Sequence, residues 1–233
     1  MKKKVIVLTG AGISAESGIK TFRDSDGLWE EYRIEDVATY DAWLRNPALV
    51  LEFYNRRRTQ LASVLPNRAH HALVMLEQKY DVRIITQNVD DLHERAGSSY
   101  ILHLHGELTK VRSTANPELV TDIGYSEIGQ GDKCSLGSQL RPHIVWFGEA
   151  VPLIQEASEL TMQADILLVI GTSLAVYPAA GLVNYVPANC RIFLVDPGDL
   201  QVQWIKNLEF IREKAGTGVP ALVDRLLSET DNN

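Results

Sequence analysis

The sequence predicts an α/β fold in which a parallel β-sheet carries helices on both faces. Apolar runs rich in β-branched residues recur along the chain, and helix-like patterns stand before or after most of them. Continuous apolar strands that alternate with helices are typical of a sheet that is buried on both faces. Nearly every run also ends in glycine or polar residues. Because ligands bind beyond the carboxyl ends of such strands, these ends form the expected functional edge.

The elements are expected in a regular order along the chain. The predicted strands cover residues 5–8, 82–85, 101–104, 144–147, 166–170 and 192–195. Two stretches interrupt the alternation: residues 25–68 have a helical pattern, and residues 107–140 have weak periodicity and are expected to form an irregular lobe over the sheet. Residues 202–211 and 220–227 are predicted as closing helices, followed by a frayed tail.

The composition is that of an ordinary soluble globular protein of 233 residues, with 45% hydrophobic and 23% charged residues. A formal net charge of −7 argues against a surface that attracts nucleic acid or anionic lipid. No run approaches the roughly 18 apolar residues of a membrane helix, and the run behind Lys4 is too short for a signal peptide. A cytoplasmic location is therefore expected. Cys134 and Cys190 are expected to be free thiols.

A glycine turn follows the first predicted strand. Gly10 and Gly12 would let the backbone approach a pyrophosphate, with helix-terminal amides near Ile13 facing its charge. Such a turn alone is equally typical of a structural strand-to-helix connection. Arg23 and a second glycine turn at residues 171–173 favour phosphate binding. A hydride-transfer enzyme is disfavoured, because Ala15 occupies the place of the third glycine in the dehydrogenase fingerprint.

His105 follows an apolar alternation and precedes a glycine, so its ring is expected at a strand end. Alone it would equally fit a structural histidine. Asn88 and Asp90 follow a neighbouring strand, and buried side chains of these types need hydrogen bonds, so together they can orient a sugar or an amide at the same edge. An imidazole of near-neutral pKa can take a proton from a hydroxyl. His93, expected in a polar helix, and His103, on the opposite strand face, are less suitable.

Several motifs then occur in a specific order: GAGISAESGI at 10–19, Phe22-Arg23, TQNVD at 86–90, Leu104-His105-Gly106, RPHIVWFGE at 141–149 and Gly171-Thr172-Ser173. With these motifs the chain resembles the sirtuins, NAD-dependent protein lysine deacylases. The resemblance implies one catalytic domain over residues 1–233. It implies a Rossmann-like large part at about 1–24, 69–106 and 141–233, and a small lobe from insertions at about 25–68 and 107–140.

The resemblance also implies a reaction in which nicotinamide leaves NAD and the acyl group passes from lysine to ADP-ribose. The implied catalytic residues are His105, as the base on a ribose hydroxyl, with Asn88 and Asp90. The implied cofactor-binding residues are Gly10, Ala11, Gly12, Ser14, Phe22, Arg23, Gln87, Asn88, Asp90, Gly171, Thr172, Ser173, Asp196 and Ala215. The implied acyl-lysine residues are Val145, Trp146, Phe147, Gly148 and Val176.

A Tyr-x-x-Arg pattern at Tyr54 and Arg57 indicates which acyl groups the protein accepts. In this respect the chain is similar to the subgroup of sirtuins that accepts succinyl- and malonyl-lysine. A tyrosine hydroxyl and a guanidinium three residues apart share a helix face and can clamp a carboxylate. The alternative is that residues 56–58 form a solvated basic face. Deacetylation is expected as a second activity.

The chain departs from the family at the structural zinc site. The first of the two usual Cys-x-x-Cys pairs is replaced by residues 113–116, and Cys134 stands alone near the second. One thiolate cannot hold tetrahedral zinc, so no zinc and no other metal is expected. A second departure is Leu194 in place of an amide residue, which leaves Asp196 alone to contact the adenosine ribose.

Acylated-lysine proteins or peptides are the expected partners, with no membrane and no sequence-specific nucleic acid binding. Two alternatives remain. A mono-ADP-ribosyltransferase would use the same cleavage of NAD. A non-catalytic sensor of NAD or ADP-ribose would keep the phosphate turns but has no need for His105, Asn88 and Asp90 together.

Overall fold

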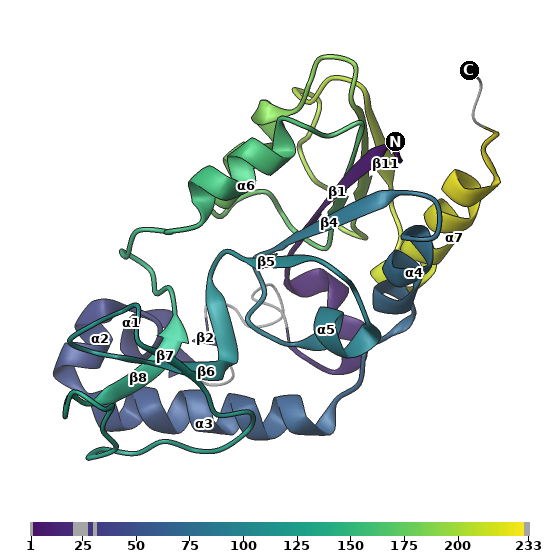
Figure 1. Ribbon diagram of the computed structural model, residues 1–233. Helices are drawn as coiled ribbons and strands as arrows, with labels where there is room; N and C mark the ends of the chain where they lie inside the picture. The colour runs from purple at the N-terminus through teal and green to yellow at the C-terminus, as the bar shows by residue number, and fades with distance from the viewer. Residues whose placement is uncertain (1, 21–27, 30–31, 231–233) are drawn as a thin grey trace.

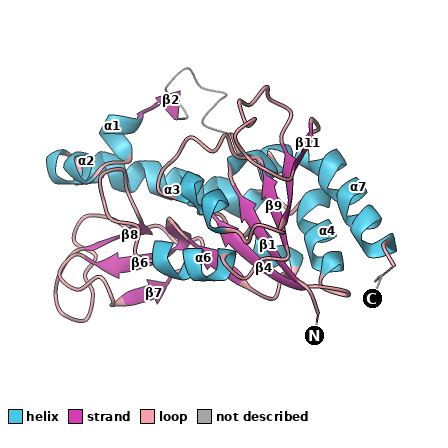
Figure 2. Cartoon of the chain, turned by 90° about the horizontal axis from the view of Figure 1, so that it is seen from above, coloured by secondary structure: helices cyan, strands magenta, loops and turns pink. Residues whose placement is uncertain are grey.

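The computed structural model describes residues 2–20, 28–29 and 32–230 (Figures 1 and 2). Its centre is a six-stranded sheet in the order β11-β10-β9-β1-β4-β5, and every neighbouring pair is parallel. The strands are β1 (Lys4–Thr9), β4 (Asp81–Thr86), β5 (Ile101–His103), β9 (Ile166–Ile170), β10 (Arg191–Val195) and β11 (Leu208–Ile211). The predicted parallel α/β architecture is confirmed.

Helices cover both faces of this sheet, as Figure 1 shows. Alternate residues of β1 join different buried clusters. Val5 and Val7 pack with residues of α4 (Arg68–Leu76) and α7 (Ala215–Ser228). Ile6 and Leu8 pack with residues of α6 (Ile154–Thr161) and of the 3₁₀ helix η4 (Ala179–Tyr185). The period of two along β1 therefore separates the two apolar layers.

A small lobe lies to one side of the sheet (Figure 2) and consists of α1–α3 and a three-stranded antiparallel sheet. The helices are α1 (Ile34–Val37), α2 (Tyr40–Arg45) and α3 (Pro47–Ser63), and the sheet has the order β7-β6-β8. The start of α3 is favoured by Asn46, whose side chain accepts from the Leu49 backbone amide, and by Pro47 at the first helical position. Leu28–Trp29 (β2) and Tyr32–Arg33 (β3) form a short antiparallel pair that the helical pattern did not predict.

Three predictions about strands and helices are wrong. Residues 144–147 are not a strand of the parallel sheet, since β8 (Leu140–Ile144) pairs antiparallel with β6 (Gly106–Ser113) and residues 145–149 follow as a loop. Residues 107–140 are not irregular, because they contain most of β6 and all of β7 (Val120–Asp122). Residues 202–211 are not a helix, because they end in β11, an edge strand beside β10. The apolar run at 144–147 resembles a central strand, but only Ile144 and Trp146 are buried, and they belong to the small-lobe core.

Two buried histidines lie where α4 meets α5 (Leu92–Ala96). His70 completes a capping box at the start of α4, because its Nδ1 accepts from the Asn67 backbone amide at 3.3 Å. Its ring meets that of His93 edge to face, with 4.9 Å between centroids. Burial lowers the pKa of His70 from 6.5 to about 4, so the ring is neutral in the folded protein near neutral pH.

Within the described residues, no helix combines the length and apolar character needed to cross a lipid bilayer.

The neutral state of His70 predicts a loss of stability in mild acid. Because the folded pKa is depressed, this stabilisation is present above 6.5 and is lost as the pH falls toward 4. We expect the His70 contribution to unfolding free energy to fall by about 2 kcal/mol between about pH 7.5 and pH 5. In His70→Gln, the amide keeps the capping box but does not titrate, so urea denaturation should show a smaller pH dependence. His71→Gln, at an exposed position of the same helix, is the control. Equal pH dependence in wild type and His70→Gln would contradict this assignment.

Candidate active site

Two glycine turns meet where the strand order of the parallel sheet reverses, between β1 and β9. The Gly12 amide donates to the Gly171 carbonyl at 2.8 Å. A Cβ atom on Gly12 would lie 2.6 Å from the Gly171 Cα, and Gly171 itself has a φ of +63°. Glycine is therefore required at both positions. The expected helix after the first turn is instead two short 3₁₀ turns, Ala11–Ile13 and Ala15–Ser17.

A buried polar network lies directly beside the first glycine turn. The Ser14 hydroxyl donates to Asp90 Oδ2 at 2.9 Å, and the Leu92 amide donates to Asp90 Oδ1 at 3.2 Å. The Asn88 side-chain amide donates to the Gly10 carbonyl at 3.1 Å and to Ser14 Oγ at 3.2 Å. Burial raises the pKa of Asp90, while the bonds from Ser14 and Leu92 oppose that rise. The network thus brings Asn88 and Asp90 together, as the sequence predicts.

The same edge continues to the neighbouring strands. Gln87 Nε2 donates to Thr172 Oγ1 at 3.3 Å, which joins the end of β4 to the end of β9. Ser173 is exposed next to the buried Thr172. Asp196 is buried at the end of β10, where its Oδ1 accepts from the Gly198 amide at 2.8 Å.

The start of α7 also belongs to this edge. Ala215 is buried at its first position, and the Gly216 amide donates to Glu16 Oε2 at 2.6 Å. The carboxylate of Glu16 thus meets the amide end of the helix, which it favours electrostatically. The predicted residues Phe22 and Arg23 lie outside the described residues.

His105 has the geometry of a general base. Its Nδ1 makes a 3.0 Å hydrogen bond with the Gln87 backbone carbonyl, which can only accept, so Nδ1 carries the proton. The lone pair of the neutral ring is then on Nε2, for which no hydrogen bond is present among the described residues. Burial lowers the pKa of His105, while the Gln87 carbonyl opposes that change. The ring is therefore neutral near pH 7 and able to accept a proton.

Two further histidines support the site from behind. His93 was expected in a polar helix, but it is only 1% exposed, and its Nε2 hydrogen-bonds to Thr9 Oγ1 at 3.1 Å. His103 bonds through Nδ1 to the Asn88 carbonyl at 3.1 Å and through Nε2 to Glu94 at 2.7 Å. Burial opposes charge on His103, but Glu94 outweighs it and raises the pKa. Residues two apart share one face of a strand, so the expectation that alternation separates His103 from His105 was wrong. β5 ends at His103, and His105 lies in the turn that follows.

The predicted acyl-lysine segment runs between His105 and the small lobe. The Val145 amide donates to the His105 carbonyl at 2.9 Å, and the Phe147 amide donates to the Ala38 carbonyl at 3.0 Å. Trp146 is buried, Phe147 is exposed and Gly148 has a φ of +88°. Val176 is exposed in the loop that follows β9. The segment is thus tied at both ends by backbone bonds.

An ion pair between the buried Arg141 and the half-buried Glu149 fixes the shape of this segment. Arg141 donates to both carboxylate oxygens of Glu149, at 2.8 and 3.0 Å. Glu149 also accepts from the Trp146 amide at 2.8 Å. The guanidinium of Arg141 stacks on the Trp146 ring, 3.5 Å from its centroid. A bidentate pair with a cation–π contact of this kind is geometrically specific, so it holds the indole in one orientation.

Tyr54 and Arg57 lie one turn apart on α3 and are 0% and 5% exposed. The Tyr54 hydroxyl accepts from Trp146 Nε1 at 2.9 Å. Burial raises the pKa of Tyr54, and the nearby charge of Arg57 acts in the opposite direction. A solvated basic face describes only Arg56, which is exposed and pairs with Glu52. Arg58 is fully buried and donates to the Leu108 carbonyl of β6 at 2.6 Å.

Hydrogen bonds stabilise the turns around Ser113 and Cys134, the positions at which the resemblance would place zinc ligands. Ser113 Oγ accepts from the backbone amides of Ala115 and Asn116, at 3.1 Å each. Cys134 Sγ donates to the same hydroxyl at 3.3 Å. One thiol and one hydroxyl do not make a tetrahedral zinc site, so the side chains present here do not fit that metal.

The chain is similar in sequence and in fold to known proteins. The model of the Sir2 family matches residues 10–178. An NAD-dependent protein deacylase of Bacteroides thetaiotaomicron is 52% identical over 230 residues, which cover 97% of this chain and 98% of that protein. A crystal structure of a Sir2 homologue–NAD complex has a TM-score of 0.86 at 40% identity, covering 97% of this chain and 90% of that chain. A Sir2–p53 peptide–NAD⁺ complex has a TM-score of 0.76 at 30% identity, covering 97% and 92%.

The central position of Ser14 in the polar network predicts an effect on NAD binding. Ser14→Ala removes the bond to Asp90 and the bond from Asn88, and hydrogen bonds to charged groups contribute about 1.5–3 kcal/mol. We expect NAD to bind about tenfold more weakly or worse, as measured by calorimetry. Ser17→Ala is the control, since Ser17 bonds to Asn67 instead. Unchanged affinity in Ser14→Ala, with an unchanged thermal midpoint, would contradict the role of the network.

Proposed function

The chain belongs to the Sir2 family, and we propose that it removes acyl groups from protein lysines with NAD as co-substrate, preferring succinyl and malonyl groups. Its relative from Bacteroides thetaiotaomicron is named an NAD-dependent protein deacylase. One water is consumed, and the products are nicotinamide, O-acyl-ADP-ribose and the deacylated lysine. Acylated proteins or peptides are therefore the partners of the site.

The observation that carries this function is the neutral, oriented ring of His105 beside the Asn88–Ser14–Asp90 network. When bound, NAD supplies a nicotinamide–ribose bond whose cleavage makes the ribose reactive toward the acyl oxygen. His105 then takes a proton from a ribose hydroxyl at Nε2, because Nδ1 is occupied by the Gln87 carbonyl. Because the tautomer is fixed, the proton acceptor is always Nε2, the ring nitrogen that faces away from the Gln87 carbonyl.

The remaining polar groups fit NAD as a ligand. The bonds of Asn88 Nδ2 to Gly10 and Ser14 leave Asn88 Oδ1 without a hydrogen bond among the described residues, so it can accept one from a ribose or carboxamide group. The backbones of the two glycine turns approach closely beside it and can meet a pyrophosphate. We assign Asp90 to holding this arrangement, since both of its oxygens already accept bonds from the protein.

The acyl preference is supported by the position of the Tyr54 hydroxyl. Its oxygen accepts from Trp146, and no acceptor for its proton is present among the described residues, so the hydroxyl can donate to a ligand. Arg57 brings a positive charge near the same hydroxyl in a buried setting. A terminal carboxylate on the acyl chain would meet both groups, whereas an acetyl group offers no such partner. Acetyl-lysine is therefore a second, weaker substrate.

Two other functions use the same nucleotide edge. A sensor of NAD or ADP-ribose would not need a proton acceptor, and His105 is oriented as one. Mono-ADP-ribosyl transfer would need no acyl pocket, whereas residues 145–148 are held between His105 and the small lobe.

The deacylase function predicts a strict dependence on both His105 and the acyl peptide. We expect His105→Ala to lower peptide deacylation by about 10²–10⁴-fold, the usual range for a general base. The measurement is nicotinamide release and loss of acyl peptide with succinylated, malonylated and acetylated peptides. His71→Ala, exposed on α4, is the control. Nicotinamide release from wild type that needs no acyl peptide would refute deacylation as the main activity.

The carboxylate clamp predicts a change of selectivity in Arg57→Met. We expect kcat/KM for succinyl peptide to fall about 10–100-fold, because a charged hydrogen bond of about 1.5–3 kcal/mol is lost, with a much smaller effect on acetyl peptide. Arg56→Met is the matched control, since Arg56 is exposed and pairs with Glu52. Equal losses for both peptides would exclude the clamp while leaving deacylation itself intact.

A further inference from the structure

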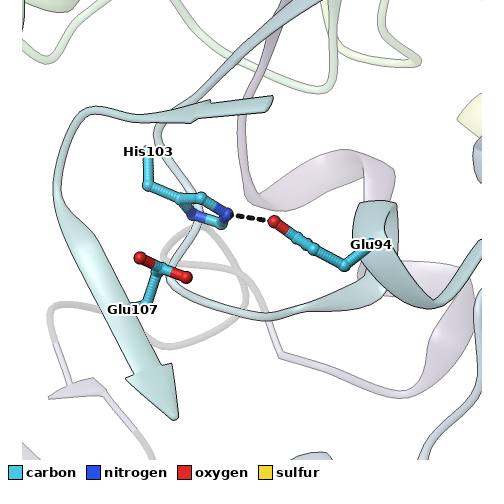
Figure 3. A group of neighbouring side chains, drawn as sticks. All are labelled: Glu94, His103 and Glu107. Atoms are coloured by element: carbon cyan, nitrogen blue, oxygen red, sulfur yellow. Dashed lines mark hydrogen bonds and ion pairs between the residues drawn. The ribbon is translucent and has the colours of Figure 1, made fainter. Parts of the chain in front are cut away.

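We propose that Glu94, His103 and Glu107 form a binding site for a divalent transition-metal ion of the Zn²⁺ class, behind the strand segment that carries His105. The three side chains come from α5, β5 and β6, and their nearest ligand atoms all lie within 4.8 Å of one another. Figure 3 shows both carboxylates beside the His103 ring. Metal–ligand bonds of about 2.0–2.2 Å put the donors of one ion roughly 3–4 Å apart, so only small side-chain shifts are needed.

His103 is oriented as a metal ligand. Its Nε2 points to Glu94 at 2.7 Å, and its Nδ1 is bonded to the Asn88 backbone carbonyl at 3.1 Å. A histidine that binds metal almost always donates its other ring N–H to a carbonyl or carboxylate, which fixes the tautomer and the ring plane. That partner lies outside the proposed ligand set. The ring is 9% exposed, so packing also holds it in place.

The donor set selects the class of ion. One imidazole and two carboxylates suit zinc and neighbouring first-row divalent ions, whereas magnesium and calcium prefer oxygen alone and copper(I) prefers sulfur. The Glu94 side chain is exposed, so the site can be reached from solvent and waters can complete the coordination. Such a set resembles open three-ligand sites more than closed structural ones.

Lys110 is the competitor of the ion in this structure. Its ammonium lies 2.7 Å from Glu107 Oε2, three residues along the same strand. Partly exposed pairs of this kind contribute about 0–1 kcal/mol, so an ion bound by three ligands can displace the ammonium. The neighbouring His143 carries a buried Nδ1 without a hydrogen-bond partner among the described residues.

The site is separate from the position of the family's zinc. Glu107 is the second residue of β6 and Ser113 is the last, so the two positions are roughly 20 Å apart along the strand. His105 lies between two of the three proposed ligands in sequence. A bound ion would therefore join α5, β5 and β6 around the turn that carries His105.

The test is Co²⁺ titration of chelator-treated, desalted protein, followed by visible absorption and calorimetry. We expect one saturable site whose spectrum lacks the strong near-ultraviolet band of thiolate ligation. Glu107→Gln should weaken binding more than about tenfold, since even outer-shell partners of a metal contribute that much. Lys110→Met should tighten binding, because it removes the competing ammonium.

Two control variants separate this site from other sources of binding. Glu118→Gln, an exposed glutamate of the small lobe, and Cys134→Ser should both bind Co²⁺ like wild type. Thermal unfolding in chelator monitors the fold of each variant, and Lys110→Met gives a gain of affinity that misfolding cannot imitate. Absence of saturable binding, equal affinities in Glu107→Gln, Lys110→Met and wild type, or loss of binding in Cys134→Ser would overturn the proposal.

Discussion

The contact between two glycine turns is the constraint on which the site depends. Because Gly12 donates directly to the Gly171 carbonyl, the backbones that follow β1 and β9 lie closer than any side chain would allow. That approach places Ser14 under the end of β4, where it bonds both Asn88 and Asp90. The site thus rests on backbone packing at the switch point of the sheet, and the polar network follows from it.

The segment that we propose to bind acyl-lysine depends on a different kind of support. The parallel sheet supplies rigid strand ends, but residues 145–148 lie in a loop. Side-chain contacts must therefore hold the loop in one conformation. Arg141 and Glu149 supply that shape through a bidentate ion pair, and the stacked Trp146 carries it to Tyr54. Arg141 is buried and Glu149 is half-buried, and their bidentate geometry fixes one conformation. Loss of Glu149 would leave the buried Arg141 without this carboxylate, whereas loss of Arg141 would leave Glu149 with the longer 3.5 Å contact to Arg112.

The sequence predicted those elements whose burial follows one simple period. Val5 to Leu8 and the matching runs of β4, β9 and β10 are continuous apolar strands because both of their faces are covered. The same reasoning failed at residues 144–147, where Ile144 and Trp146 are buried in the small-lobe core and not in the parallel sheet. It missed β11, whose edge position leaves Glu209 exposed and the strand only partly buried. Partners far apart in sequence, such as Trp146 with Tyr54 and Arg58 with Leu108, carry no local pattern. The structure places them only through tertiary packing.

The bond between Glu16 and Gly216 joins two segments 200 residues apart. It ties the first glycine turn to α7, which also packs on α4 under the parallel sheet. During synthesis the first glycine turn leaves the ribosome long before α7. Glu16 therefore cannot bond to the Gly216 amide until α7 has left the exit tunnel. The nucleotide edge is therefore completed only after residues 215–228 are available to fold. A nascent chain that lacks α7 already contains His105, yet it still lacks the helix end that closes the edge.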